Sequence, residues 1–169
     1  ALSPSFNGLN FERGRSAFMN LLAKSLTVSR PANTLSRVTF INGLSGVGKT
    51  TLTAKLSASQ QEIGEDNITL AKLGYKNEPS DETLRSHGRL LNKAVLRLTP
   101  ENLMETLYST QGKILVDVSL DPRDSVRSIQ STIDFLTHDD VSSIVAIPGG
   151  SSSIFIRSQA KLYENLKPE

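Results

Sequence analysis

The sequence contains no cysteine and no tryptophan, and it has six phenylalanines, three tyrosines and two histidines among 169 residues. The absence of cysteine excludes disulfides and thiolate metal sites, and His87 and His138 are too isolated to form a ligand cluster. No apolar run approaches the roughly 18 residues of a membrane span. A net charge of +2 is too small to indicate nucleic-acid binding. What remains is the composition of a globular domain with few aromatic core residues.

The first 37 residues are poor in acids and therefore basic, and they are also rich in serine and asparagine. This segment contains one acidic residue, Glu12, and five basic residues: Arg13, Arg15, Lys24, Arg30 and Arg37. Apolar residues at helical spacing predict a helix over 11–29, which Pro31 ends. Such a stretch is typical of an organelle transit peptide and equally of an arm that docks on a protein or RNA partner. We therefore predict a basic extension, helix plus linker, over 1–37, and favour an organelle, mitochondrion or plastid, over the cytoplasm.

Residues 43–50, GLSGVGKT, match the phosphate-binding loop pattern G-x-x-x-x-G-K-[ST]. Its glycines let the backbone bend so that consecutive N–H groups converge on phosphate oxygens at a helix N-terminus. Lys49 then neutralises the outer phosphates, and the Thr50 hydroxyl binds Mg²⁺. A short apolar strand before the loop and a helix after it provide the context that the motif requires. The predicted nucleotide-binding residues of the loop are Gly43, Ser45, Gly46, Val47, Gly48, Lys49, Thr50 and Thr51.

The rest of the chain alternates predicted strands and helices. After a strand over 37–41 and a helix over 49–62, we expect a strand over 68–73, a helix from Asp81 to about Leu98 and another from Thr99 to Gly112. A strand over 113–118, a helix from Asp121, a strand over 141–147 and a helix over 151–166 follow. This alternation predicts a three-layer α/β/α P-loop NTPase fold with a parallel sheet, over 38–169. Ligands then bind at the carboxyl ends of the strands.

Asp117 stands near the end of the apolar run 113–118, where a buried parallel strand presents a carboxylate to the loops. In phosphate-loop proteins such an acid helps to bind the Mg²⁺ ion. The alternative is an aspartate that only stabilises the turn after the strand. Thr50 and Asp117 are therefore the two candidate metal ligands.

Several segments, taken in order from Val38 to Pro168, resemble the adenylate kinase and nucleoside monophosphate kinase family. The loop stands where that family has G-x-P-G-x-G-K-G-T. Residues 80–85 (SDETLR) correspond to its S-T-G-D-x-L-R segment. Residues 114–117, followed by Pro122-Arg123, correspond to its D-G-F-P-R segment. The resemblance implies ATP·Mg²⁺ as donor and an acceptor monophosphate held by Arg85 and Arg123. Arg157, with Lys161-Leu162-Tyr163, is similar to the segment that leads into the family's lid and to its R-L-x-x-Y helix, which implies that Arg157 binds the nucleotide.

The departures from that family pattern concern catalytic parts. Val118 replaces the glycine after the aspartate, and extra residues separate Asp117 from Arg123. There is no room for a lid between Arg157 and Lys161, and the chain ends before the family's fifth strand. A lid matters because phosphoryl transfer must exclude water. As alternatives, Arg85 and Arg123 are solvated arginines in first helical turns, and Arg157 belongs to a plain basic helix face.

Three functions are therefore open. The first is a kinase that transfers phosphate from ATP·Mg²⁺ to a nucleoside monophosphate, with Lys49, Arg85 and Arg123 as catalytic residues. The second is a catalytically degenerate, kinase-like module that serves as a structural subunit of a larger, organellar or ribonucleoprotein, assembly. The third is a regulatory or targeting NTPase, because GVGKTTL recurs in such proteins. We rank it lower, since the chain has no guanine-reading N-K-x-D or T-K-x-D.

Overall fold

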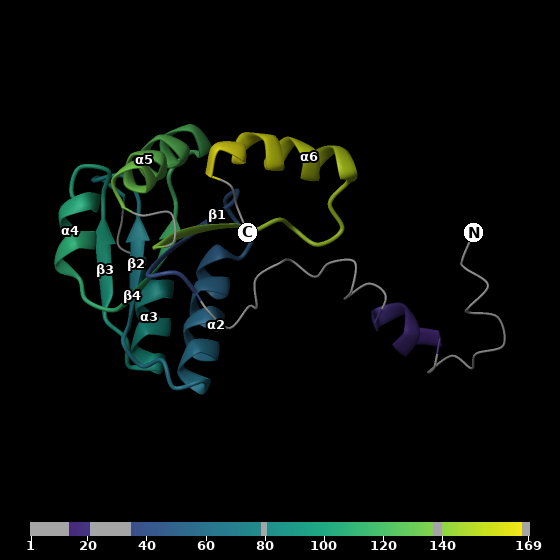
Figure 1. Ribbon diagram of the computed structural model, residues 1–169, viewed down its shortest axis with the longest axis horizontal. Helices are drawn as coiled ribbons and strands as arrows, with labels where there is room; N and C mark the ends of the chain where they lie inside the picture. Colours follow the sequence, from purple (N-terminus) through teal and green to yellow (C-terminus); the bar gives the residue numbers. More distant parts are fainter. Residues whose placement is uncertain (1–13, 21–34, 79–80, 137–139, 167–169) are drawn as a thin grey trace. The chain divides into compact units, whose positions relative to one another are not determined.

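The computed structural model describes residues 14–20, 35–78, 81–136 and 140–166, and the chain divides into two compact units, Ala1–Ala32 and Asn33–Glu169. In the first unit, residues 14–20 form a helix, drawn in purple in Figure 1, on which Phe18 and Met19 are exposed. The remainder of the helix predicted over 11–29, and the linker after it, lie outside the described residues. Among the described residues, no helix is both long and apolar enough to span a membrane.

The second unit is built on a parallel sheet of five strands in the order β3-β2-β4-β1-β5. The strands are β1 (Val38–Asn42), β2 (Ile68–Leu73), β3 (Val95–Leu98), β4 (Lys113–Val118) and β5 (Val141–Val145). The helices of this unit are α2 (Lys49–Glu62), α3 (Glu82–Leu91), α4 (Leu103–Ser109), α5 (Pro122–Phe135) and α6 (Ser153–Leu162), followed by a 3₁₀ helix, Glu164–Leu166. The predicted α/β/α fold with a parallel sheet is confirmed.

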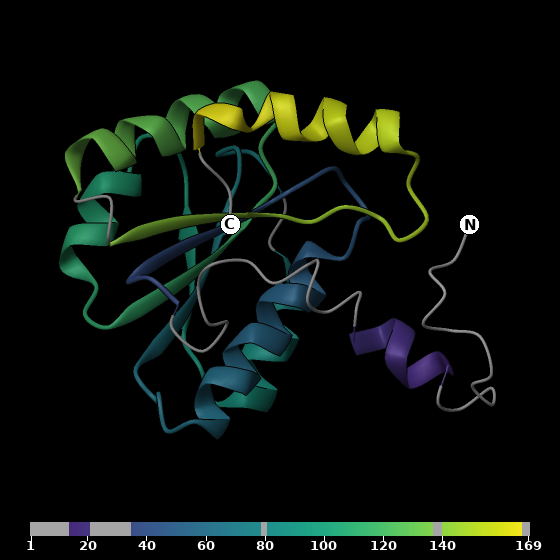
Figure 2. The same cartoon turned by 45° about the vertical axis from the view of Figure 1, so that its right-hand side comes forward.

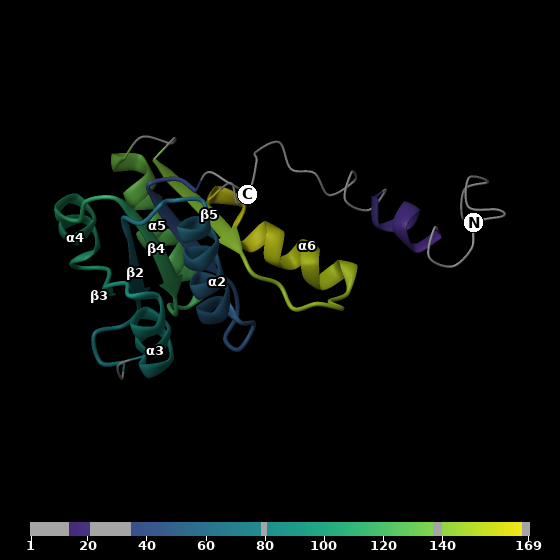
Figure 3. The ribbon, with the colours of Figure 1, turned by 90° about the horizontal axis from the view of Figure 1, so that it is seen from below.

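Helices cover both faces of the sheet, with α2 and α3 on one side and α5 and α6 on the other (Figures 1 and 2). Because side chains alternate along a strand, each face has its own core. Leu70 and Leu115 pack with Leu84 of α3 on the first face. Phe40 and Val116 pack with residues of α4, α5 and the 3₁₀ helix on the second. Figure 3 shows the same layers from below.

The prediction of one helix from Asp81 to about Leu98 is wrong for the second half of that segment. It ends at Leu91, because Asn92 adopts the left-handed conformation at φ 53° and stops the helix. The chain then turns and pairs Val95–Leu98 in parallel with β2 as edge strand β3. The spacing of Leu91, Val95 and Leu98 fits one helix face, but in the structure the first belongs to α3 and the other two to β3. The sheet thus has a strand that we did not predict.

The other corrections concern the ends of elements. The helix expected from Thr99 begins only at Leu103, after a turn in which the Asn102 side chain accepts a 2.7 Å hydrogen bond from the Thr99 backbone N–H. The last predicted helix, 151–166, divides into α6 and the 3₁₀ helix, and β5 ends at Val145 rather than Ile147. These differences lie outside the loop that follows β1.

Candidate phosphate-binding site

The loop between β1 and α2 has the backbone of a phosphate cradle. Gly43, Gly46 and Gly48 have φ angles of 136°, 78° and 90°, a region that other residues rarely adopt. Gly43 is also sterically constrained, since a Cβ atom there would lie 2.5 Å from the carbonyl oxygen of Ala146. Helix α2 begins at Lys49 without a side-chain cap, so the N–H groups of its first turn are available to a ligand.

A cleft of about 560 Å³ lies over this loop. Its walls are the loop and the start of α2 on one side, Lys72 of β2, and residues 119–122 after β4. The volume is within the roughly 300–1,000 Å³ of small-molecule sites. The cleft therefore lies at the carboxyl ends of the central strands, where parallel sheets bind their ligands.

The start of the loop is held by hydrogen bonds from the α5 side of the sheet. Asn42, the last residue of β1, donates a 2.9 Å hydrogen bond to the Ser143 hydroxyl and accepts one of 2.6 Å from Ser125 of α5. Tyr163, after α6, is buried, and this burial raises the pKa of its hydroxyl, while a hydrogen bond with the Gly43 backbone opposes the shift. The loop thus begins on a rigid support.

Lys49 is buried at the start of α2, and its ammonium donates a 2.8 Å hydrogen bond to the carbonyl of Leu44 within the loop. Burial lowers the pKa of Lys49; Asp117 opposes that shift and the nearby Lys72 adds to it. The ammonium is therefore held at the rim of the cradle by a neutral acceptor, which a phosphate oxygen can replace at little cost.

Asp117 and Thr50, the two predicted metal ligands, are brought together. The Thr50 hydroxyl donates a 2.6 Å hydrogen bond to Asp117 Oδ2. The Asp117 side chain is 0% exposed, and its other oxygen, Oδ1, is buried with no hydrogen-bond partner among the described residues. The carboxylate therefore faces the protein interior beneath the start of α2, and its turn-stabilising alternative is not what the structure shows.

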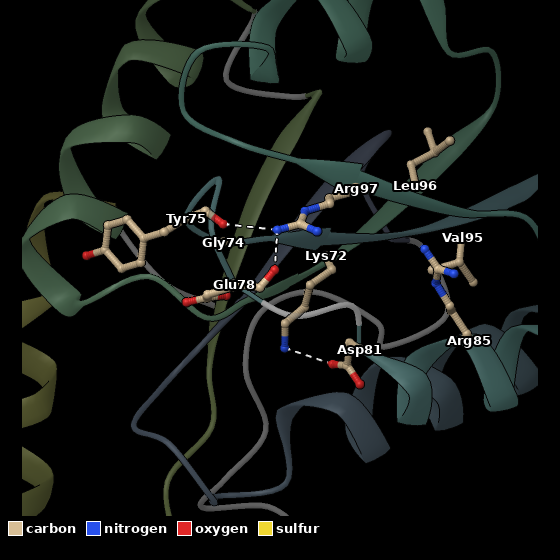
Figure 4. A pocket seen from close by; sticks show the side chains of 9 residues that line it. All are labelled: Lys72, Gly74, Tyr75, Glu78, Asp81, Arg85, Val95, Leu96 and Arg97. Atoms are coloured by element: carbon tan, nitrogen blue, oxygen red, sulfur yellow. Dashed lines mark hydrogen bonds and ion pairs between the residues drawn. The ribbon is translucent and has the colours of Figure 1, made fainter.

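Lys72 is the residue of this site that sequence analysis missed. It occupies the position of β2 that pairs with Asp117 of β4, and its ammonium donates a 3.1 Å hydrogen bond to Asp117 Oδ2. The same ammonium lies 3.0 Å from Asp81 Oδ2, at the N-cap of α3 (Figure 4). The available signal was a single charged residue inside the apolar strand ITLAKL, since an interior lysine requires a partner.

The charges on this network stabilise one another. Burial is the largest influence on Lys72 and lowers its pKa, but Asp117 and Asp81 outweigh it, so the pKa of Lys72 is raised. Burial of Asp81 acts to raise its pKa, yet hydrogen bonds from Leu84 N–H and Lys72 hold the pKa below its usual value. Both side chains of the Lys72–Asp81 pair are accordingly charged at neutral pH.

Of the two predicted metal ligands, Thr50 lines the cleft, whereas Asp117 is engaged by Thr50 and Lys72 below it. Magnesium binds through oxygen ligands, and Thr50 and Asp117 supply the right atom types. However, Asp117 Oδ2 already accepts from both Thr50 and the Lys72 ammonium, and the carboxylate is closed to solvent. A cation on that oxygen would share it with a positive charge. Within the described part of the chain, no cluster of three or more His, Cys, Asp or Glu side chains could hold a metal ion.

The three predicted arginines are not gathered in the cleft. Arg85 lines a neighbouring pocket of about 30 Å³, which also contains Lys72 and Arg97, and a more open pocket of about 640 Å³ together with Arg89 and Lys93. In Figure 4 the Arg85 side chain is drawn next to Val95, which lines the same pocket. Arg123 lines a depression on α5 beside Leu162 that shares Asp121 and Pro122 with the cleft, and Arg157 is exposed on α6. Of the predicted site residues, those of the loop and Asp117 therefore form one site, together with the unpredicted Lys72.

Comparisons with known proteins agree with this geometry at the level of the fold. No family model and no curated protein matches the sequence. Among solved structures, the chain is similar to FlhF complexed with GTP and Mg²⁺ (19% identity, TM-score 0.62) and to FlhF complexed with GMPPNP and Mg²⁺ (20%, 0.62). It is also similar to the cell division protein FtsY from Thermotoga maritima (13%, 0.64).

These similarities cover 95%, 95% and 90% of this chain, but only 64%, 64% and 58% of the respective solved chains. The chain therefore spans about three fifths of the length of the proteins it matches. Together with the loop and the parallel sheet, these structural similarities show the fold of a P-loop NTPase. They do not single out the adenylate kinase family that the sequence motifs resemble.

Proposed function

We propose that this chain binds a nucleoside triphosphate, with the phosphates in the cradle formed by residues 43–50. The observation that carries the proposal is the loop backbone, in which three glycines at positive φ bend the chain in front of an uncapped helix N-terminus. A helix N-terminus and converging N–H groups favour anions, and Lys49 adds a positive charge. The cleft over the loop is large enough for the phosphates and part of a nucleoside.

Either ATP or GTP fits this proposal. The resemblance to nucleoside monophosphate kinases implies ATP, whereas one of the similar FlhF structures is a complex with GTP. The sequence contains no guanine-binding motif, and the cleft is lined by residues of the loop, Lys72 and residues 119–122, among which no aromatic side chain is present to stack on a base. We therefore assign the phosphates to the loop and leave the base to experiment.

Phosphoryl transfer to a second nucleotide, the finer prediction, finds little support in the geometry. A kinase must hold an acceptor phosphate next to the donor, in a site closed to water. The pocket of about 640 Å³ that Arg85 lines shares no residue with the cleft, and Arg123 lies in a depression that meets the cleft at Asp121 and Pro122, so the two arginines do not converge on one acceptor site. Binding without transfer to a monophosphate is the activity that the arrangement favours.

A structural role in a larger assembly is a second candidate. The observation that favours it is the network of Lys72, Asp117 and Asp81, in which the buried carboxylate has an ammonium partner without any ligand. Such a unit holds its charges in place whether or not nucleotide is bound. In this case the basic extension over 1–37 would attach the domain to a protein or RNA partner.

The proposal is tested by calorimetric titration of the chain with ATP and with GTP. We expect Lys49→Ala to weaken binding at least about tenfold, because a charge-assisted hydrogen bond contributes roughly 1.5–3 kcal/mol. Lys55→Ala removes an exposed lysine from the same helix and serves as the control. Absence of binding to both nucleotides by the folded chain would refute the proposal, as would equal affinity of wild type and Lys49→Ala.

A further inference from the structure

The position of Lys72 relative to the cleft sets this loop apart from a simple phosphate cradle. Lys72 lines the cleft together with Lys49 and Thr50. Its side chain is 22% exposed, whereas that of its partner Asp117 is 0% exposed. Of this ion pair, therefore, only Lys72 lines the cleft.

The Lys72 ammonium also has one N–H donor that is not used by its two carboxylate partners. It carries three N–H groups, and the carboxylates of Asp117 and Asp81 take two of them. Both carboxylates come from rigid elements, the end of β4 and the N-cap of α3, so the nitrogen is held in place before any ligand binds. A positioned cation with a free donor at the edge of a phosphate cradle is suited to a phosphate oxygen.

The carboxylate that would have to bind a metal ion is already paired with an ammonium group. Asp117 Oδ2 accepts from Thr50 and Lys72, and Oδ1 is buried. A divalent cation would have to open this packed pair and then lie beside the ammonium, against the repulsion of like charges.

We propose that the Lys72 ammonium takes the place of the divalent cation beside the phosphates, so that this chain binds a triphosphate without a metal ion. The inference rests on the proposed triphosphate binding and specifies how its charge is neutralised. Lys49 and the loop N–H groups hold the phosphates from one side and Lys72 from the β2 side. Asp117 acts as a positioning residue that holds Lys72 and does not touch the ligand.

The test is calorimetric titration of the chain with GTP, ATP and inorganic triphosphate, in EDTA and again in Mg²⁺. We expect the dissociation constant of wild type to differ by less than about threefold between the two buffers. In Lys72→Met the affinity in EDTA should fall at least about tenfold, the loss expected for one charge-assisted contact. Lys72→Arg retains the charge and should retain most of the metal-free affinity.

Lys113→Met is the matched control. Lys113 is also a strand lysine, it pairs with Glu65 at 2.8 Å, and its side chain is 23% exposed, but it lies at the opposite end of β4 from Asp117. Its removal should leave binding unchanged in both buffers. Thermal unfolding of each variant shows whether it is folded. If Lys72→Met does not fold, the comparison of wild-type affinity in the two buffers still decides the question.

Failure of the inference and failure of the proposed function give different results. Wild-type binding that is at least about tenfold weaker in EDTA than in Mg²⁺ would overturn the inference and leave triphosphate binding intact. Equal affinity of Lys72→Met and wild type in EDTA would also overturn it. No binding of any of the three ligands in either buffer would overturn both.

Discussion

The Ser125 hydroxyl of α5 donates a 2.6 Å hydrogen bond to Oδ1 of Asn42, the last residue before the phosphate-binding loop. Both side chains are buried, and the Asn42 amide nitrogen donates in turn to Ser143. Residues far apart in the sequence thereby fix the point from which the loop departs.

We expect Ser125→Ala to lower the free energy of unfolding by about 1–3 kcal/mol, because it leaves a buried amide oxygen without a donor. Urea unfolding measures this loss. Ser131→Ala, at an exposed position of the same helix, should change the free energy by no more than about 0.5 kcal/mol. Equal losses in the two variants would show that the buried hydrogen bond is unimportant.

Gly43→Ala should destabilise the protein more than Gly46→Ala. Both positions have positive φ, so each substitution carries a backbone cost of roughly 1–2 kcal/mol. At Gly43 the added Cβ also lies 2.5 Å from the Ala146 carbonyl, whereas at Gly46 it meets no atom within 4 Å. We expect a further loss of about 1–3 kcal/mol at Gly43 from this overlap. Thermal unfolding compares the two; a larger loss in Gly46→Ala would contradict the loop geometry.

The ion pair of Lys72 predicts a loss of stability at high pH. Burial alone would lower the pKa of Lys72, but Asp117 and Asp81 raise it above the unfolded value of 10.5. The folded state therefore holds this proton more tightly, and the pair's stabilisation is fully present below about pH 10.5. It is lost as the pH rises through the folded-state pKa.

Urea unfolding of wild type and Lys72→Met at a series of alkaline pH values measures this contribution. The difference in unfolding free energy between the two proteins should be constant at neutral pH and shrink above about pH 10.5. A difference that stays constant throughout the alkaline range would show that Lys72 is not stabilised by its carboxylate partners.

Leu98→Ala should cost about 2–5 kcal/mol, as expected for a large side chain removed from a core. Leu98 is 1% exposed at the end of β3, whereas Leu90 of α3 is 83% exposed. Leu90→Ala should therefore stay within about 0.5 kcal/mol of wild type. Denaturant unfolding of both variants tests the unpredicted strand, and a large loss in Leu90→Ala would contradict the end of α3 as described.

Elements with strong local signals were predicted to the residue. α2, β2 and β4 lie at the predicted positions, because glycine ends the helix and continuous apolar runs mark buried strands. β3 was missed because it is short and follows α3 after three residues, and its apolar side chains continue the helical spacing. The stop signal was Asn92, whose left-handed conformation the sequence does not display.

For the candidate site, the sequence alone determined the phosphate-binding loop, because its glycines, Lys49 and Thr50 are contiguous and their chemistry depends on local backbone conformation. Only the tertiary structure decided what Asp117 does. Lys72 lies 45 residues before Asp117, on a strand that becomes its neighbour only when β4 inserts between β2 and β1. The order and register of parallel strands follow from packing of the whole sheet, so no local pattern could reveal that an ammonium, rather than solvent, faces this carboxylate.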